Sequence, residues 1–202
     1  NEDLITNIAH YIYEADIEKP DWFEKHYQEE KQKHNSLSTE LSPLEIGKKI
    51  ALNTKGVLGK NLLNEISTKE TEAALDFCST KAIHLTDSMA TELNTHIKRV
   101  SDKNRNPINE AKNDELAYII KSKKLLASGK EIKPQLIETA DKNIAYYPIM
   151  TNKMCMQCHG EVNTEVLPRT IAKIKDIYPN DKATGYKTDE LRGIWVIEMD
   201  KN

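Results

Sequence analysis

The chain has 202 residues, of which 38% are hydrophobic and 30% are charged. This length fits one domain with an elaborated end, and the composition is that of a well-solvated globular protein that can still bury a core. The formal net charge of −3 gives no electrostatic reason to expect a nucleic-acid partner. The sequence has no run of about 18 apolar residues, so it contains no candidate membrane span.

The N-terminal half is dominated by helical patterns. Apolar residues recur at helical spacing over residues 4–33, with an interruption at Pro20. A second helix is expected to begin at Pro43 and to end near Gly59. A third is expected over residues 68–93, where apolar side chains follow one another at spacings of three and four.

The second half changes to strand and turn patterns, interrupted by one helix. Residues 114–126 look helical and end near Gly129. The expected strands are residues 96–101, 135–139, 144–150 and 194–199. Helices followed by a small antiparallel sheet predict an α+β fold. We expect residues 1–44 to form an N-terminal helical extension and residues 45–202 to form the second domain.

The most informative stretch is Cys155-Met156-Gln157-Cys158-His159, which is the attachment sequence of a c-type haem. Two thiols at this spacing can add to the vinyl groups on one porphyrin edge, and the following histidine then lies under the iron. A redox dithiol gains nothing from that histidine, and a structural zinc site needs four ligands although only one other cysteine is present. The sequence therefore predicts one covalent haem c, held by Cys155 and Cys158 and ligated by His159.

The second axial ligand decides what the iron does. Cys78 lies on an apolar helix face, where a buried cysteine often serves as a small hydrophobic residue. A ferric haem favours ligation instead, because the metal would deprotonate the thiol. His84 is six residues further along the same helix, about 240° around it, and leaves that face. The other candidates are His10, His26, His34, His96, Met150, Met154 and Met156.

Several other side chains are candidates for contact with the cofactor. Arg99 and Arg105 suit the haem propionates, because a guanidinium group binds a carboxylate through two parallel hydrogen bonds. Arg105 has an alternative role, in which it braces its loop through backbone carbonyls. Tyr146 and Tyr147 alternate on one expected strand, and we expect Tyr147 to lie beside the porphyrin. Further residues that can cover the exposed haem edge are Tyr178, Tyr186 and Arg192.

Four separated segments carry a resemblance to a known family. They are Ala74-Leu75-Asp76-Phe77-Cys78, the Arg99–Asn109 stretch with Arg105-Asn106-Pro107, Cys155–Gly160, and Tyr178–Tyr186 with Leu191-Arg192-Gly193. In these the chain resembles the single-haem, PAS-like c-type cytochrome domains, which also occur as sensory regions of histidine kinases and chemoreceptors. The likeness covers residues 45–200 and departs from the family at Asn113-Asp114-Glu115, where an aromatic residue is more usual.

The resemblance implies His159 and Cys78 as the two axial ligands, and a PAS-like antiparallel sheet preceded by long helices. With Cys78 as a ligand, we expect a sensor of redox state or of a diatomic gas, because loss of a weak thiolate ligand on reduction would open a coordination site. The alternative is an electron-transfer cytochrome whose partner is another redox protein. We do not expect an enzyme, because no acid/base constellation accompanies the motif.

Covalent haem attachment takes place on the outer side of the bacterial inner membrane, so a periplasmic location is expected. The chain begins at Asn1 without an initiator methionine or a signal sequence. We therefore expect that a targeting or anchoring segment has been removed.

Overall fold

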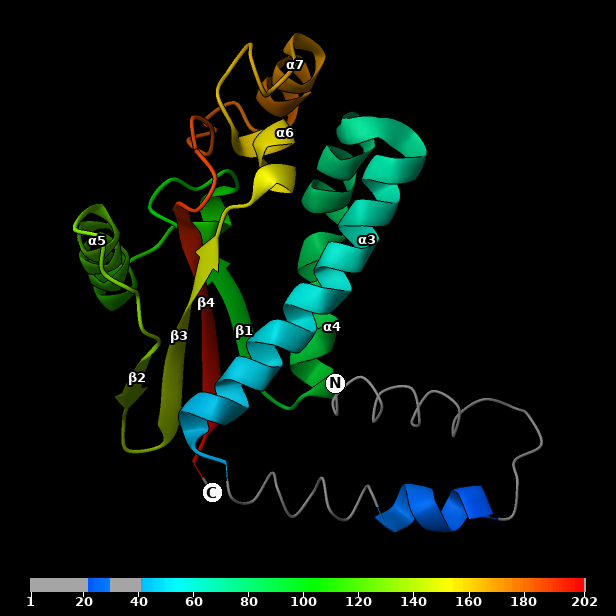
Figure 1. The fold of residues 1–202 in the computed structure, drawn as a ribbon, viewed down its shortest axis with the longest axis vertical. Helices are drawn as coiled ribbons and strands as arrows, with labels where there is room; N and C mark the ends of the chain where they lie inside the picture. Colours follow the sequence, from blue (N-terminus) through cyan, green and yellow to red (C-terminus); the bar gives the residue numbers. More distant parts are fainter. Residues whose placement is uncertain (1–21, 30–40, 202) are drawn as a thin grey trace. The chain divides into compact units, whose positions relative to one another are not determined.

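The computed structural model describes residues 22–29 and 41–201 (Figure 1). Residues 22–29 are helical and fall inside the helical region expected over residues 4–33, the remainder of which lies outside the described residues. The chain divides into two units, residues 1–42 and 43–202, and the second contains all the elements that follow.

A four-stranded antiparallel sheet forms the centre of the second unit, with the strand order β1-β4-β3-β2. The strands are β1 (His96–Val100), β2 (Gln135–Glu138), β3 (Lys142–Met150) and β4 (Leu191–Asp200). Successive side chains of a strand point to opposite faces. On β4, Trp195 and Ile197 therefore join the core on one face, while Ile194 and Val196 join the core on the other.

Helices cover both faces of this sheet. The long helix α3 (Pro43–Thr80) and α4 (Ala82–Glu92) pack on the face that carries Trp195, and α5 (Asn113–Ala127) packs on the opposite face (Figure 1). The expected α+β fold, with long helices preceding an antiparallel sheet, is confirmed. The four expected strands and the helix before Gly129 are present, and Gly129 has a φ of 72° as a helix-terminating glycine often does.

The helix expected to end near Gly59 continues past it. Gly59 lies inside α3 with no atom within 4 Å of where a Cβ would be, so it faces open space in a continuous helix. The chain turns at Glu70 instead, where φ is 75° and ψ is 172°. A second helical stretch then runs back to Thr80 and carries Cys78, and Figure 1 shows the two stretches of α3 lying side by side.

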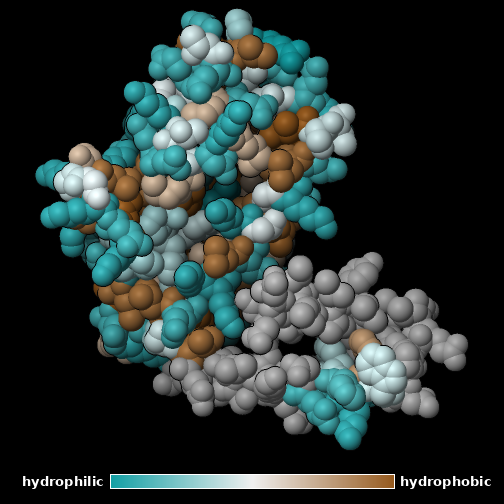
Figure 2. All heavy atoms as spheres, viewed as in Figure 1, coloured by the Kyte–Doolittle hydropathy of each residue, from teal (hydrophilic) through white to brown (hydrophobic). Residues whose placement is uncertain are grey.

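Two short helices near one end of the sheet complete the unit. They are α6 (Met156–His159), which follows a 3₁₀ turn over Lys153–Cys155, and α7 (Pro168–Ile177). Neither was expected from the sequence. Figure 1 shows both beside the turn of α3. Figure 2 shows a mostly hydrophilic surface on which hydrophobic residues appear in scattered patches.

Candidate functional site

The two motif cysteines lie on consecutive tight turns. The Asn152 side chain caps the 3₁₀ turn, because its Oδ1 accepts hydrogen bonds from the backbone N–H groups of Met154 (3.0 Å) and Cys155 (3.3 Å). Cys155 and Cys158 are three residues apart across the helical start of α6, so their side chains lie on one side. Both thiols are free and partly accessible. The segment therefore offers two neighbouring thiols for attachment.

The His159 imidazole is held by one backbone group. Its Nδ1 lies 2.6 Å from the carbonyl oxygen of Ala183, and since a carbonyl only accepts, Nδ1 carries the proton. Burial lowers the pKa of His159 well below its usual value, and the neighbouring charges of Arg192 and Arg105 lower it further. The ring is therefore neutral, with the lone pair on Nε2, which is the tautomer that ligates a metal.

Arg105 holds the loop that supplies this carbonyl. Its Nε donates to Oδ1 of Asp181 at 2.9 Å, and its Nη2 donates to the carbonyl of Cys158 at 2.7 Å. Nη2 also lies 3.5 Å from the carbonyl oxygen of Ala183. These contacts correspond to the bracing role named as the alternative for Arg105.

Cys78 lies close to the motif. Leu75, one helical turn before Cys78 on the same face, packs in a small core that includes Cys158. Burial raises the pKa of the Cys78 thiol, while the positive charges of Arg99 and Arg105 act in the opposite direction. Since Arg105 also bonds the Cys158 carbonyl, the structure brings Cys78 and the motif together around one guanidinium group.

Arg99 is a second cation beside Cys78. It projects from β1 toward the face packed by α3 and α4, and its guanidinium carbon lies 5.5 Å from the centre of the Trp195 ring. Among the described residues no carboxylate pairs with it. Burial lowers its pKa, and the nearby Cys78 raises it. A partly buried cation without a counter-charge fits an anionic group at this place, either a propionate or a thiolate.

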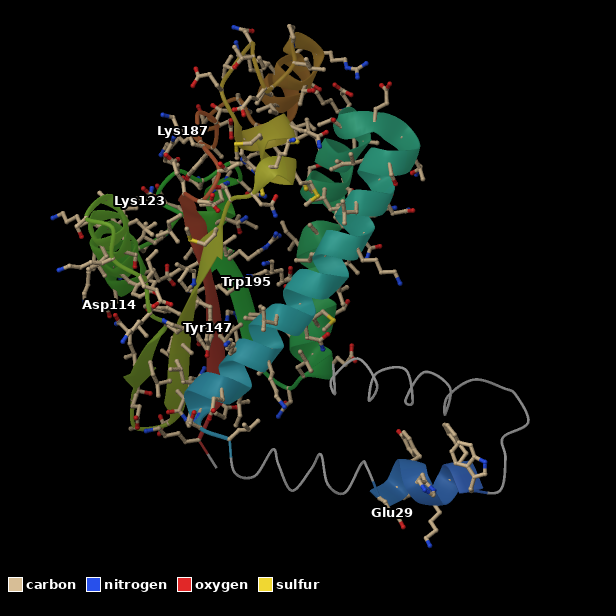
Figure 3. All side chains as sticks on the ribbon, viewed as in Figure 1. Glu29, Asp114, Lys123, Tyr147, Lys187 and Trp195 are labelled. Atoms are coloured by element: carbon tan, nitrogen blue, oxygen red, sulfur yellow. The ribbon has the colours of Figure 1, made fainter. Side chains whose placement is uncertain are left out.

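Tyr147 is not brought to this site. Its hydroxyl donates to the carbonyl of Leu44 at 2.6 Å, and its ring lies against Gly47 at the start of α3. Figure 3 shows Tyr147 near the middle of the sheet, where it is the cross-strand neighbour of Trp195. Tyr147 therefore contributes to the sheet core, and it is not included in the site proposed below.

The aromatic and basic residues after the motif do gather around His159. The Tyr186 ring lies edge-on to the His159 ring at 6.3 Å. Arg192 and Lys103 lie over the Tyr186 ring at 5.3 Å and 4.5 Å. Tyr178 is buried and lies near Cys78, whose charge contributes to the raised pKa of its phenol after the larger effect of burial.

Three further residues of the site were not expected from the sequence. Asp181 lies in a polar loop segment, Ala183 has no side-chain chemistry, and Trp195 lies in a run of strand residues. The sequence signal available for Asp181 was its place in the segment shared with the resembling family. That segment could not show that its partner is Arg105, 76 positions away.

The other candidate ligands with described positions are exposed, bonded elsewhere, or held beside the attachment cysteines. His84 is exposed on α4, and His96 is close to Glu198 on the neighbouring strand (3.6 Å). The Nδ1 of His26 bonds the carbonyl of Trp22. Met150 is 37% exposed at the end of β3, and the motif methionines Met154 and Met156 remain beside the cysteines. His10 and His34 lie outside the described residues.

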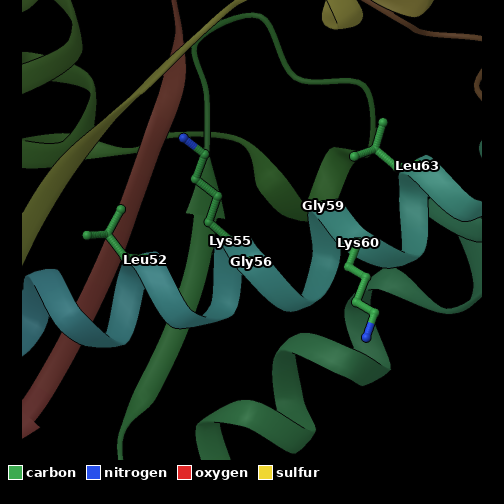
Figure 4. A pocket seen from close by; sticks show the side chains of 6 residues that line it. All are labelled: Leu52, Lys55, Gly56, Gly59, Lys60 and Leu63. Carbon is green, nitrogen blue, oxygen red and sulfur yellow. The ribbon is translucent and has the colours of Figure 1, made fainter. Parts of the chain in front are cut away.

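Three further features concern the rest of the described residues: bare metal sites, membrane-spanning helices and surface depressions. Within the described ranges, no three His, Cys, Asp or Glu side chains gather as a bare metal site would need, whereas a haem needs only two axial ligands from the protein. None of the described helices is both long and apolar enough to cross a membrane. A shallow depression along α3, between Leu52 and Leu63, is lined by glycines and lysines (Figure 4).

Comparison with known proteins identifies relatives of the whole second unit. The family described as Tll0287-like: Tll0287 matches residues 11–199. A solved structure, described as the cyanobacterial heme-protein Tll0287, has a TM-score of 0.58 and 18% identity, and covers 80% of this chain and 98% of that chain. No curated protein matches. The resemblance stated from the sequence motifs is confirmed at the level of family and fold, and the chain belongs to the Tll0287-like family.

Proposed function

We propose that this chain carries one haem c, attached through Cys155 and Cys158, with His159 and Cys78 as axial ligands. The observation that carries the proposal is the His159 ring, fixed by Ala183 with Nε2 free beside two accessible thiols. The cofactor is also supported by the description of the solved relative as a heme-protein. We further propose that the protein is a sensor of redox state or of a diatomic gas rather than an enzyme.

The residues of the chain have separate roles in this proposal. When bound, a haem supplies an iron that changes oxidation state and accepts diatomic ligands. His159 would hold the iron through its neutral nitrogen, and Cys78 would hold it through its sulfur. A thiolate from Cys78 favours the ferric state, and Arg99 on Trp195 compensates its negative charge. The partly buried guanidinium of Arg99, which no carboxylate among the described residues pairs with, supports the presence of an anion there.

The helix that carries Cys78 is tied to the motif and to α7, which gives a route for a signal. The Thr71 hydroxyl lies 3.1 Å from Oε1 of Gln157, between the two cysteines. On the outer side, Thr170 and Lys173 of α7 contact two carboxylates of the same helix, at 2.8 Å in both cases. If Cys78 left the iron, its helix could move and disturb these contacts. A local change at the iron would then reach the surface of the molecule, as a sensor requires.

A periplasmic location is part of the proposal, because covalent haem attachment takes place outside the cytoplasm. The alternative function is electron transfer to a redox partner protein. It needs an iron that keeps both axial ligands in both oxidation states. The two functions therefore differ in whether Cys78 remains bound after reduction.

The test is an optical and EPR comparison of the wild-type chain, Cys78→Ala and the control Ser79→Ala. Ser79 is the next residue of the helix, and its hydroxyl bonds only the carbonyl of Asp76 on the surface. We expect Cys78→Ala to lose the thiolate-ligated low-spin ferric signature and Ser79→Ala to keep it. An unchanged signature in Cys78→Ala would remove Cys78 from the site.

Addition of CO to the reduced wild-type chain separates the two functions. Rapid binding, with a spectral change, supports the sensor function because it requires an open coordination site. Failure to bind CO, together with fast reversible voltammetry, would contradict the sensor proposal and favour electron transfer.

A further inference from the structure

The pair formed by Arg105 and Asp181 is buried and lies behind the haem motif. Nε of Arg105 and Oδ1 of Asp181 are 2.9 Å apart, and their side chains are 9% and 8% exposed. Two charges placed this far from water require each other, because either charge alone would be left without compensation. Neither side chain has accessible surface for a role in solution, so their function lies in the groups that they hold.

The pair holds Ala183 by both of its backbone groups. Oδ1 of Asp181 accepts a hydrogen bond from the Ala183 N–H at 3.1 Å, and Nη2 of Arg105 lies 3.5 Å from the Ala183 carbonyl oxygen. The same carbonyl accepts the proton of His159 Nδ1 at 2.6 Å. Ala183 is fully buried. The orientation of the His159 ring thus depends on a carbonyl whose position is set by two buried charges.

The Arg105 guanidinium also reaches the motif itself. Its Nη2 donates to the carbonyl of Cys158 at 2.7 Å, in the residue directly before His159. The segment that follows Ala183 is bonded to the end of the motif. The Tyr186 N–H donates to the His159 carbonyl (2.9 Å), and the Gly185 N–H donates to the Gly160 carbonyl (2.8 Å). Arg105 therefore fixes both the backbone that carries the imidazole and the acceptor that orients it.

We propose that Arg105 and Asp181 are positioning residues for His159, which fix its tautomer and ring plane at the iron through the Ala183 carbonyl. This inference rests on the haem function proposed above. Partners behind a ligating histidine orient its ring and adjust its basicity, and their loss weakens or alters the metal site. The role differs from a purely electrostatic one, in which the two charges would act on the iron directly.

The experiment compares three variants of the haem-loaded chain. Asp181→Ala removes the acceptor of both Arg105 and the Ala183 N–H, whereas Asp181→Asn removes the charge but keeps an oxygen in the same place. Asp176→Ala is the control, because Asp176 is an exposed carboxylate on α7. For each folded variant we measure the g values of the low-spin ferric EPR spectrum and the reduction midpoint. The content of covalent haem is measured separately, after denaturation.

We expect Asp181→Ala to shift and broaden the g values, because the ring plane is no longer fixed. Asp181→Asn is expected to restore the wild-type g values while its midpoint stays shifted upward, because an uncompensated positive charge favours the ferrous state. The control is expected to match the wild type in all three measurements. A tenfold change in the oxidation equilibrium corresponds to about 59 mV for one electron.

The positioning role would be overturned if Asp181→Ala kept the wild-type g values and changed only the midpoint, since that is the result of charge alone. If Asp181→Ala does not accumulate in a folded form, Arg105→Lys is used instead. Lysine keeps the charge but cannot reach the three acceptors of Arg105. Wild-type g values in Arg105→Lys would equally overturn the proposal. A wild-type chain without covalent haem would contradict the proposed function itself, which is a different outcome.

Discussion

At the scale of single residues, the segment around His159 has little freedom to accept larger side chains. A Cβ on Gly160 would meet the Glu165 carboxylate and would lie 2.7 Å from the backbone carbonyl oxygen of Met156. The Gly160 N–H bonds that same carbonyl at 2.9 Å, which closes α6 directly after the histidine. The lack of a side chain at Gly160 is therefore a requirement of the site's geometry.

Gly160→Ala is expected to lower the free energy of unfolding by about 1–3 kcal/mol, the usual cost of forcing an extra carbon into a packed position. It should also disturb His159, because the shift falls on the backbone that carries the ring. Thermal or urea unfolding checks the first effect and the ferric EPR spectrum checks the second. Unchanged stability together with an unchanged spectrum would show that the close contacts around Gly160 relax without cost.

Gly56→Ala is the matched substitution in open space, because Gly56 lies inside α3 and no atom lies within 4 Å of where its Cβ would be. Glycine within a helix costs about 0.5–1 kcal/mol relative to alanine, so this variant is expected to gain that amount of stability. Urea unfolding measures it. A loss of stability would mean that the exposed face of α3, which Figure 4 shows, is covered in solution.

At the scale of elements, the turn in α3 places Cys78 opposite the motif. Glu70 adopts φ 75° and ψ 172°, a backbone region that is essentially restricted to glycine. Its carboxylate pairs with Arg169 of α7 at 3.2 Å, but both side chains are more than half exposed, and such a pair contributes little. The turn is therefore maintained by the packing of the two helical stretches and not by Glu70 itself.

Glu70→Gly is expected to raise the free energy of unfolding by about 1 kcal/mol, because it removes backbone strain at the turn. The optical spectrum of the haem-loaded chain should not change, since the packing that places Cys78 is kept. Urea unfolding of this variant and of Glu65→Gly, which lies in the regular part of α3, provides the comparison. Destabilisation of both variants by equal amounts would contradict a strained backbone at Glu70.

The sequence allowed the elements to be predicted where a pattern is local. The alternation of side chains along β4 and the hairpin between β2 and β3 follow from neighbouring residues, and so does the apolar face of the helix that carries Cys78. The extension of α3 beyond Gly59 was missed, because a glycine in open space costs little and need not end a helix. The short helix α6 was missed because four residues give no periodicity.

The candidate site could be predicted only in part, for a similar reason. Cys155, Cys158 and His159 form a contiguous motif, whereas the contacts of Arg105 with Asp181 and Ala183 join segments more than 70 residues apart. Arg105 has the same side chain whether it binds a propionate or a carbonyl, so its role depends on what the fold places near it. Tyr147 shows the same limit for a strand residue. The alternation along the strand predicts that it faces inward, but only the fold shows that its hydroxyl bonds the carbonyl of Leu44.

At the scale of the whole molecule, the second unit is a sheet covered by helices on both faces, with the motif beyond one end of the sheet (Figure 1). Segments from distant parts of the sequence are joined there by hydrogen bonds. They are the Cys78 helix, α6, α7 and the loop that contains Ala183. A haem attached at Cys155 and Cys158 and ligated by Cys78 would make its axial and packing contacts with these segments only in the folded state. It should therefore stabilise the unit.

Removal of one axial ligand tests this stabilisation. Cys78→Ala is expected to unfold at a lower temperature than the wild type when both carry haem, while the two haem-free chains should differ less, because Cys78 then contributes only its small apolar side chain. Thermal unfolding of the four samples, followed by circular dichroism, measures both differences. Equal differences in the two pairs would show that Cys78 has no connection with the bound cofactor.

The central claim, covalent attachment through Cys155 and Cys158, is tested most directly by the mass of the denatured chain after expression in cells that attach haem c. The wild type is predicted to keep the mass of one haem through denaturation, and Cys155→Ala/Cys158→Ala is predicted to lose it although His159 and Cys78 remain. A second c-type cytochrome expressed in the same cells shows that attachment is working. If that cytochrome carries haem while the wild-type chain has the mass of the polypeptide alone, the account is contradicted.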